Sequence, residues 1–512
     1  MNKLHNFRSL AFALALTALA SCSTDFIDLQ DPNAVAASTY YRNENDVLLA
    51  VNGIYQSLRS GNSIGETSAL FNEERSDNAG RNDNQSNAGE PFQFNDFSLL
   101  PSNTYLKSHW LGLYQTISRS NQVLEGIEKV TFSDPKLKEQ YQAEAKFLRA
   151  LIYFELVRKW GDVPLVTKPL NTTDEVTAST FREKKEVVYQ QIVADLTDVV
   201  ASPLPNLQNA ANKGRVSKAA GNALLGKVYL TMATTLDAAN RTTNLNQAKT
   251  YLLAAYNMRT FGQLKEIPYA DVFDVNKKTT NPELIFQIVN KQGDINYSSS
   301  IARNNQAKGE TVNSLFTSSG SGTNVKPDLV KDYETGDVRK DFSIKYANDP
   351  IVKDYFITKF RDNSAAAGTN GYGGNDWILL RYADVILMLA EVTMYLGDDA
   401  AAIGYLDQVR ERAGLPLYKA SMSDPAYAAK YPTLKLAILH ERRVELAFEN
   451  QRWYDLLRFF TTDELVSYFK AKNQADYGLA KLSNFGPKDR YYPIPFDEFK
   501  LNPEAMFQNA GY

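Results

Sequence analysis

Apolar residues recur at helical spacing along most of the chain, and this pattern restricts the fold more than any other feature. Between residues 45 and 59, Val47, Val51, Ile54 and Leu58 follow one another at three- or four-residue steps. This spacing places them on one face of a helix. Similar stripes occupy residues 110–130, 136–160, 183–199, 217–234, 246–258, 380–396, 399–413 and 434–460. Short turns between them predict helix pairs stacked into a superhelix of tetratricopeptide type.

Two long polar stretches interrupt the helical pattern. Residues 60–103 and 260–376 are rich in Asn, Ser and Gly, and within the second stretch residues 284–289 form a short apolar run typical of a strand. Loops of this length inside a compact domain usually carry function. We therefore predict a mostly α fold, in which tetratricopeptide-like helix pairs form a scaffold and a loop-rich second part contains minor β structure.

The N-terminus has the form of a secretion signal. Lys3 and Arg8 precede an apolar run at 10–19 that is too short to span a bilayer comfortably. The run ends in Leu-Ala-Ser-Cys at Cys22, which resembles the bacterial lipobox, where the cysteine is lipidated and becomes the first mature residue. We predict a signal peptide at 1–21 and attachment to a membrane through lipid on Cys22. The alternative is an ordinary secretion signal with an incidental cysteine.

Charge and composition exclude several classes of function. Lys and Arg number 56 against 59 Asp and Glu, so the chain has no excess of cations with which to neutralise phosphates, and we expect no nucleic-acid partner. One cysteine cannot form a disulfide within the chain, and three histidines leave little material for a zinc site. The same scarcity of histidine and cysteine argues against nucleophilic catalysis by a Ser–His or Cys–His pair.

Glutamates at four-residue spacing form the densest charged motif. Glu441, Glu445 and Glu449 share one helical face and would repel one another without cations nearby. Two of them could serve as the acid and nucleophile of a glycoside hydrolase. The alternative is an internal network neutralised by arginines. The candidate arginines are Arg442, Arg452, Arg410 and Arg412.

Aromatic residues in the loops are the candidates for ligand binding. An aromatic ring offers a flat, rigid apolar surface that matches the face of a sugar ring, and Asn, Asp and Arg can bond the hydroxyl groups around it. Packing as a lid over the core is the alternative for each ring. The candidates outside the acidic segment described next are Trp377, Tyr372, Tyr297, Arg303, Asn304, Phe92, Phe94 and Tyr105.

A segment rich in side-chain oxygen atoms runs from Asp77 to Glu90. Asp77 and Asn78 begin it, and we include both among the candidate ligand-binding residues. Such a segment could be a solvated loop, a polar ligand contact or a structural calcium site. The glycine and terminal carboxylate of an EF-hand are missing, so we predict no catalytic residue, no metal and no cofactor beyond that possible calcium.

Several motifs, read in order, carry a family resemblance. They are CSTDFIDLQDP from Cys22, AEAKFLRALIYFELVRKWGDVPLV from Ala143, GRVSKAAGNALLGKVYL from Gly214, RYADVILMLAEV from Arg381, ERRVELAFENQRWYDLLRF from Glu441, YYPIP and the terminal QNAGY. Together they resemble the SusD/RagB family of Bacteroidetes outer-membrane lipoproteins along nearly the whole mature chain. The ligand-contacting loops of that family vary, so the resemblance does not reach them.

The resemblance implies a position and partners for this chain. It implies a nutrient-binding protein, not an enzyme, on the outer membrane facing the cell exterior, with a SusC-like TonB-dependent transporter as partner and an oligosaccharide as ligand. Peptide binding, as in the RagB branch, a glycoside hydrolase and a purely structural scaffold are the alternatives. We expect a lipidated segment at 22–45, a helical region at 46–260, and a second region at 261–512 with long ligand-facing loops and closing helices.

Overall fold

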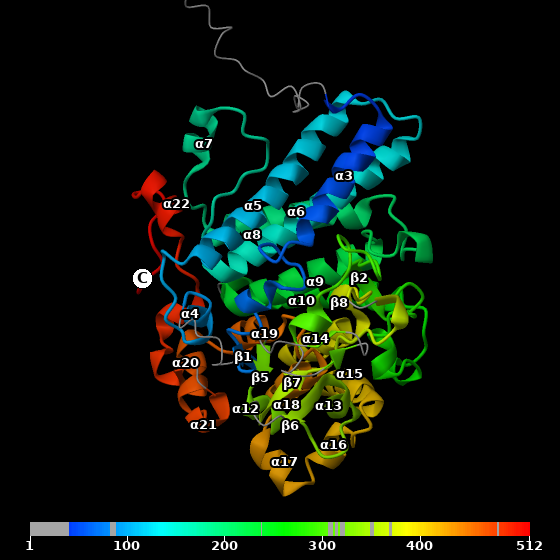
Figure 1. Ribbon diagram of the computed structural model, residues 1–512, viewed down its shortest axis with the longest axis vertical. Coiled ribbons are helices and arrows are strands. Elements are labelled where there is room, and N and C mark those ends of the chain that lie inside the picture. Colours follow the sequence, from blue (N-terminus) through cyan, green and yellow to red (C-terminus); the bar gives the residue numbers. More distant parts are fainter. Residues whose placement is uncertain are drawn as a thin grey trace, which may run out of the picture.

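The computed structural model describes residues 40–81, 89–236, 238–305, 311–312, 316–317, 323–348, 353–367, 371–478 and 481–512. Helices dominate these residues and the sheets are small, which confirms the predicted fold class (Figure 1). No helix in the described ranges is both long enough and apolar enough to cross a bilayer. The expected signal peptide and Cys22 lie outside the described residues, and lipidation stays a prediction.

A chain of long helices forms the scaffold, each packed on its sequence neighbour. Helix α5 packs on α6, α6 on α8, α8 on α9 and α9 on α10, and α10 then packs on α14. Helix α14 contacts both α15 and α18, and α3 packs on α5 and α6. The bounds are α3 (Glu44–Leu58), α5 (Thr104–Gly126), α6 (Pro135–Trp160), α8 (Lys185–Ala201), α9 (Lys218–Thr235), α10 (Arg241–Asn257), α14 (Tyr382–Tyr395), α15 (Asp399–Arg412) and α18 (Leu434–Glu445).

Local sequence signals explain where these helices begin and how closely they pack. Asp134 caps α6 by accepting a hydrogen bond from Lys136 N at 2.9 Å. The helix ends at Gly161, whose φ of 74° suits glycine. At Gly226 in α9, an added Cβ would lie 2.6 Å from Cγ of Leu252 in α10. The missing side chain therefore lets these two helices approach closely.

The prediction of one continuous helix at 434–460 is wrong, because the structure contains two helices there, separated by a turn. Helix α18 ends at Glu445, and α19 (Arg452–Phe459) starts after a turn. Phe448 and Asn450 in that turn have φ of 66° and 59°, a left-handed conformation that no helix contains. The apolar periodicity continues through the turn, so it concealed the break.

The β structure is minor. Strands β2 (Leu284–Ile288) and β8 (Trp377–Arg381) pair antiparallel, which confirms the predicted strand at 284–289. A four-stranded sheet has the order β1-β5-β7-β6, and β3 pairs with β4. These strands are β1 (Ala79–Arg81), β3 (Thr311–Val312), β4 (Phe316–Thr317), β5 (Thr323–Val325), β6 (Ile344–Asn348) and β7 (Lys353–Ile357).

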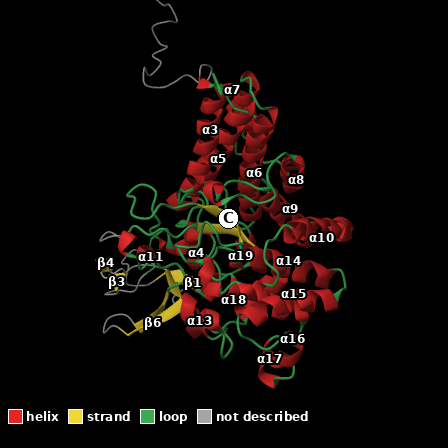
Figure 2. Cartoon of the chain, turned by 90° about the vertical axis from the view of Figure 1, so that its right-hand side faces the viewer, coloured by secondary structure: helices red, strands yellow, loops and turns green. Residues whose placement is uncertain are grey.

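Short helices fill the loops and close the chain. They are α4 (Phe92–Asn95), α7 (Thr173–Ser179), α11 (Ile301–Asn304), α12 (Pro327–Val330), α13 (Val338–Ser343), α16 (Tyr418–Ser421), α17 (Pro425–Lys430), α20 (Thr462–Lys470), α21 (Gln474–Tyr477) and α22 (Phe496–Leu501). Seen from the side, α11, β3 and β4 lie on one face, and α8, α9 and α10 lie on the other (Figure 2).

Buried ion pairs form the centre of the second part. The Arg381 guanidinium donates to Glu283 at 2.8 Å, to Glu445 at 2.6 Å and to Glu449 at 2.8 Å. Glu441 accepts from Arg339 at 2.6 Å. The side chains of Arg410 and Arg412 also pair with these glutamates, whereas Arg442 pairs with Asp384 and Asp455, and Arg452 with Asp77.

This network decides between the two interpretations of the charged motif. Burial alone would raise the pKa of Glu445, but the charges of Arg412, Arg381 and Arg339 hold it well below its usual range. The general acid of a glycosidase needs a raised pKa. The glutamates therefore form an internal network with Arg410 and Arg412.

Candidate ligand-binding site

Loops from three parts of the chain meet beside the β2–β8 pair. The carboxylate of Glu66 accepts hydrogen bonds from Ser299 Oγ at 2.6 Å, from the Ser300 amide at 2.6 Å and from Ser300 Oγ at 2.9 Å. Ser299 and Gly373 exchange backbone hydrogen bonds of 2.7 and 3.0 Å. The first polar loop is thereby fixed to both segments of the second.

Buried carboxylates hold the shape of these loops. Asp376 accepts from Lys278 Nζ at 2.9 Å, from Gln287 at 2.7 Å and from the Asn290 amide at 2.8 Å. Burial raises the pKa of Asp376, and the charge of Lys278 opposes that rise. Asp362 accepts from the Gly374 amide at 2.7 Å. These acids are buried and serve to hold the loops in place.

An open groove of about 290 Å³ lies where these loops approach the end of α3. Tyr297 stands at the groove with 48% of its surface exposed, and the Arg59 guanidinium lies 5.6 Å from the centre of its ring. Lys213 and Arg215 line the same groove. The volume is at the lower end of the range for small-molecule sites.

The groove wall is rigid and polar. Tyr55 donates from its hydroxyl to Glu144 at 2.5 Å and accepts from the Val216 amide at 3.0 Å. Arg215 donates to Glu144 at 3.0 Å and to Asn52 at 2.9 Å. Burial alone would raise the pKa of Tyr55, and the Glu144 charge raises it further. The Tyr55 hydroxyl therefore stays protonated and can donate.

The 213–215 segment closes the groove against the end of β2. Gly214 has a φ of 94°, and a Cβ there would lie 2.4 Å from Cγ2 of Val289. Lys213 Nζ donates to the carbonyl groups of Asn281 at 3.3 Å and Leu284 at 3.1 Å. Burial lowers the pKa of Lys213. A side chain at position 214 would push this segment away from the strand, so glycine is required there.

Four of the predicted ligand residues lie on the joined loops. Tyr297 faces the groove, and the Tyr372 carbonyl accepts from the Gly293 amide at 2.9 Å on the adjoining loop. Arg303 is half-buried in α11, and exposed Asn304 donates to Ser300 Oγ at 3.1 Å. The structure thus brings these loops together, and ligand contact by these residues stays a prediction.

The other predicted aromatics lie apart from the groove. Phe92 is half-buried in α4, and Tyr105 is 42% exposed in the first turn of α5. Figure 1 places α4 on the far side of the second part from β2. These two rings and the groove therefore do not form one site.

The structure corrects the expected positions of Trp377 and Phe94. Trp377 begins β8 opposite Ile288, is 2% exposed and packs at 5.6 Å against the Phe360 ring. Phe94 is fully buried, with its ring 5.4 Å from that of Phe71. Both rings belong to the main hydrophobic core.

Asp77 and Asn78 are likewise buried, contrary to their expected place in a solvent-facing loop. Burial alone would raise the pKa of Asp77, but the charges of Arg443, Arg452 and Lys472 hold it well below its usual range. Asn78 donates to Glu73 at 2.9 Å. Cationic side chains of the protein therefore already neutralise the Asp77 carboxylate, which was a candidate ligand for calcium. Residues 82–88 of the same segment lie outside the described chain.

Within the described residues, one group has the geometry of a possible metal site. Ligand atoms of Glu334, His440 and Glu441 lie within 4.8 Å of one another. Arg410 donates to Glu334 at 2.7 Å and to Glu441 at 3.0 Å. Burial alone would lower the pKa of His440, but Asp332 raises it above its usual value. The His440 imidazole lies in hydrogen-bond contact with Glu334 at 3.1 Å, and the Arg410 guanidinium already pairs with both carboxylates, so the donor set does not fit a metal ion.

The groove residues Arg59, Lys213 and Arg215 escaped the sequence analysis. Arg59 ends a predicted helix, Lys213 directly precedes the motif that begins at Gly214, and Arg215 lies inside that motif. More than 150 residues separate Arg59 from Lys213, as their numbers show. No local pattern marks such a pairing, so the fold alone identifies it.

Comparison with known proteins finds similar proteins along most of the chain. A model described as SusD family matches residues 348–512, and a model described as starch-binding associating with outer membrane matches residues 25–230. SusD-like protein P2 of Formosa agariphila is 26% identical, covering 98% of this chain and 99% of its own length. A SusD-like protein of Bacteroides ovatus is 25% identical, covering 97% and 94%.

Solved structures share the fold. A laminarin binding SusD-like protein has a TM-score of 0.71 and 26% identity, with 92% of this chain and 100% of that chain covered. Surface glycan-binding protein A from Bacteroides thetaiotaomicron, in complex with laminarihexaose, has a TM-score of 0.74 and 18% identity, with 91% and 100% covered. The two family models and these relatives confirm the resemblance to the SusD/RagB family drawn from the motifs of the sequence.

Proposed function

We propose that this protein is a lipid-anchored outer-membrane protein that captures an oligosaccharide at the cell surface and passes it to a SusC-like TonB-dependent transporter. The observation that carries the proposal is the groove beside Tyr297, where an exposed aromatic ring adjoins fixed polar donors. Among relatives, the laminarin binding protein and the laminarihexaose complex support a glycan as ligand.

A sugar ring would stack on Tyr297 while polar side chains bond its hydroxyl groups. Arg59, Arg215 and Asn52 provide donors and acceptors from two other segments. The hydrogen bonds of Glu66 and the close approach at Gly214 hold these segments before ligand arrives, which lowers the ordering cost of binding.

The groove favours binding over cleavage. No Asp or Glu is among the described residues that line it. Hydrolysis of a glycosidic bond by the common mechanisms needs two carboxyl groups flanking that bond. A ligand held here therefore meets hydrogen-bond donors and an aromatic face, and leaves intact.

Lipid on Cys22 would hold the protein near its transporter. Tethering raises the effective concentration of ligand at the transporter mouth, so modest affinity in the groove suffices for delivery. Purification of the native protein from outer membranes tests this part. We expect the transporter to accompany the wild type and Cys22→Ala to leave the membrane fraction.

Calorimetric titration with a panel of glycans tests the site, using a soluble form that lacks residues 1–22. We expect Tyr297→Ala to weaken binding about fivefold, because one aromatic contact contributes about 1 kcal/mol. Tyr105→Ala is the matched control, since that ring is similarly exposed but lies on α5. Equal affinity of both variants, or release of new reducing ends at enzymatic turnover, would contradict the proposal.

A peptide is the second candidate ligand, and one observation favours it. Arg59, Lys213 and Arg215 place three cations around the groove, which suits a peptide carboxylate. Competition between peptides and glycans separates the candidates. Displacement of bound glycan by peptides with a free carboxyl terminus, and not by their amidated forms, would assign the groove to peptides.

A further inference from the structure

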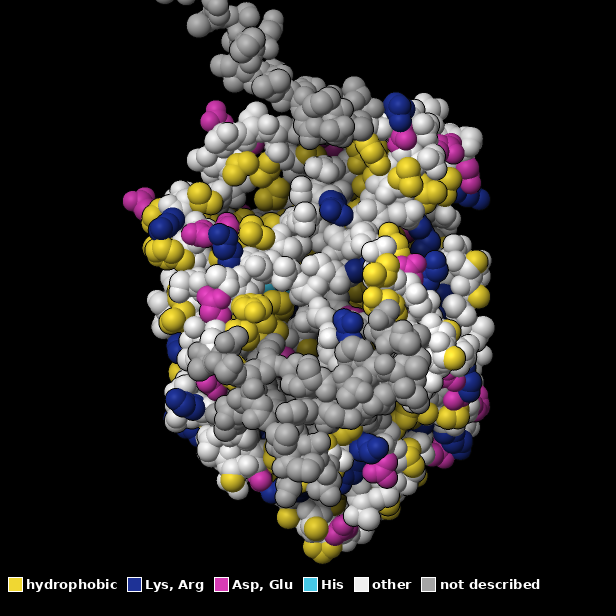
Figure 3. Space-filling view, viewed as in Figure 1, with side chains coloured by type: hydrophobic (Ala, Val, Ile, Leu, Met, Phe, Trp, Pro, Cys, Tyr) yellow, Lys and Arg dark blue, Asp and Glu magenta, His cyan; other side chains and the backbone are white. Residues whose placement is uncertain are grey.

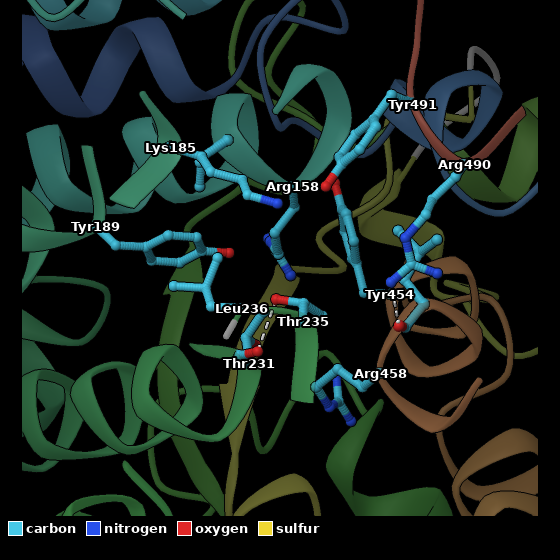
Figure 4. A pocket seen from close by; sticks show the side chains of 12 residues that line it. Arg158, Lys185, Tyr189, Thr231, Thr235, Leu236, Tyr454, Arg458, Arg490 and Tyr491 are labelled. Atoms are coloured by element: carbon cyan, nitrogen blue, oxygen red, sulfur yellow. Dashed lines mark hydrogen bonds between the residues drawn. The ribbon is translucent and has the colours of Figure 1, made fainter. Parts of the chain in front are cut away.

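A second pocket, distinct from the groove, lies where α6, α8 and α9 meet α19 (Figure 4). Its cavity volume is about 20 Å³, and four cations line it: Arg158, Lys185, Arg458 and Arg490. No Asp or Glu is among its described lining residues. Helices α8 and α9 lie on the opposite side of the molecule from α11 and the ligand-facing loops (Figure 2). The pocket is therefore separate from the proposed glycan site.

Polar tips converge on this pocket from separate elements. In Figure 4, the ammonium of Lys185, the guanidinium of Arg158 and the hydroxyl groups of Tyr189 and Tyr491 point toward a common space. The Arg158 guanidinium lies 3.8 Å from the centre of the Phe154 ring on one side, which fixes its plane. A preorganised cluster of donors of this kind is suited to an anion.

Two of the four cations at the pocket already pair with carboxylates, Arg158 with Glu155 and Arg458 with Glu391 and Asp455. Arg490 donates to the carbonyl groups of Phe460 at 3.2 Å and Leu457 at 3.1 Å. Lys185 lies 6.0 Å from the centre of the Tyr491 ring. Across the part of the chain that the structure describes, neither cation forms an ion pair with a carboxylate.

Arg458 supplies an independent observation. Its Nε and Nη2 bond Glu391 at 3.1 and 2.9 Å, whereas its Nη1 is buried without a hydrogen-bond partner. The side chain is 1% exposed and lines the pocket. A buried donor without a partner costs free energy, and an anion in the pocket would offset that cost.

We propose that this pocket binds a small oxyanion, a phosphate or sulfate group either free or carried by a larger molecule. Arginine forks and tyrosine hydroxyls match the oxygen atoms of such a group, and Lys185 adds a compact charge. The cavity is too small for a sugar ring but admits a compact group. Because α6, α8 and α9 lie in the first part and α19 in the second, the anion would join the two parts and stabilise their contact.

Thermal unfolding and calorimetry of the soluble form that lacks residues 1–22 test this site. The protein is measured in sodium phosphate, in sodium sulfate and in sodium chloride at equal ionic strength. We expect phosphate or sulfate to bind saturably and to raise the midpoint of unfolding above its value in chloride. Lys185→Gln should weaken that binding about tenfold, since one charge-assisted bond is lost. Lys265→Gln is the control, because its ammonium pairs with Glu411 on the surface elsewhere.

Two results would overturn the proposal. One is a midpoint in phosphate and in sulfate equal to that in chloride. The other is wild-type anion affinity in Lys185→Gln, which would place any bound anion elsewhere. Arg490→Gln is a second variant at the pocket. If Arg490→Gln does not fold, the affinity of Lys185→Gln alone decides the outcome. Tighter binding of a sulfated or phosphorylated sugar than of the free anion would identify a carried group, and equal binding a free one.

Discussion

The helices before residue 260, the first part of the molecule, and those after it, the second part, are each stabilised by a different kind of interaction. Helices α9 and α10 of the first part pack through small and apolar residues, with Gly226 against Leu252. Helices α14 and α18 of the second part pack around arginines and carboxylates that water does not reach, with Arg381 at the centre. Apolar contacts tolerate exchange of similar residues, whereas a buried charge tolerates no loss of its partner. The charged motif of the sequence thus serves packing.

The surface differs from this charged interior. On the face shown in Figure 3, Lys and Arg side chains are interspersed with Asp and Glu, and no broad area of one sign dominates it. The ion pairs around Arg381 lie inside the molecule, away from this surface.

Removing the central cation of the second part should have the largest effect. Arg381→Met leaves Glu283, Glu445 and Glu449 with one cation fewer in the core, and we expect the free energy of unfolding to fall by about 3–5 kcal/mol. Chemical denaturation measures this. Lys146→Met, which breaks a surface pair, should cost less than about 1 kcal/mol. Equal losses in the two variants would refute the distinction.

Acid should destabilise the protein through the same interior. Burial alone would raise the pKa of Glu334, but hydrogen bonds from His440 and Arg410 lower it from 4.5 to about 2. The unfolded chain therefore binds more protons than the folded chain between these values. The stabilising contribution is complete above about pH 4.5 and is lost as the pH falls toward 2. Denaturant titrations across this range measure it, and Glu334→Gln should show a shallower decline.

The apolar part should respond to a single methyl group. Gly226→Ala places a Cβ 2.6 Å from Cγ of Leu252, and we expect a loss of about 1–3 kcal/mol in unfolding free energy. Gly404→Ala in α15 is the matched control, because nothing lies within 4 Å of its Cβ. That variant should gain about 0.4–1 kcal/mol. A neutral Gly226→Ala would show that the helices can separate without cost.

The smallest effect on stability should come from the groove. Tyr297→Ala removes an exposed ring, and we expect a change in unfolding free energy within about 0.5 kcal/mol. Trp377→Ala, by contrast, empties a core site and should cost about 3–5 kcal/mol. Thermal unfolding of the pair distinguishes a ring that packs from a ring that is free to bind. A destabilised Tyr297→Ala variant would show that the Tyr297 ring packs against the protein and is not free to bind a ligand.

Long helices were predictable because their apolar spacing is local. The stripes at 136–160 and 217–234 correspond to α6 and α9, and the apolar run at 284–289 corresponds to β2. Strand β8 was not predictable from its own sequence, since glycine and asparagine precede Trp377 and suggest a loop. Its strand character comes from pairing with β2 some ninety positions earlier, as the partners Ile288 and Trp377 show.

The candidate site divides in the same way. Tyr297 was predicted because an aromatic residue in a polar loop is visible in the sequence, and the structure places it at the groove. The same signal failed for Trp377 and Phe94, because exposure depends on what packs over a ring. Arg59 and Lys213 became candidates when the fold placed α3 beside the end of β2.

By itself, the sequence determined the helical scaffold and the family resemblance, because apolar periodicity and ordered motifs are carried by neighbouring residues. Tertiary structure decided which charges are buried, which rings are free and which loops meet. These properties arise from contacts between residues far apart in the chain, where one desolvated arginine or one strand pairing sets the environment of many others.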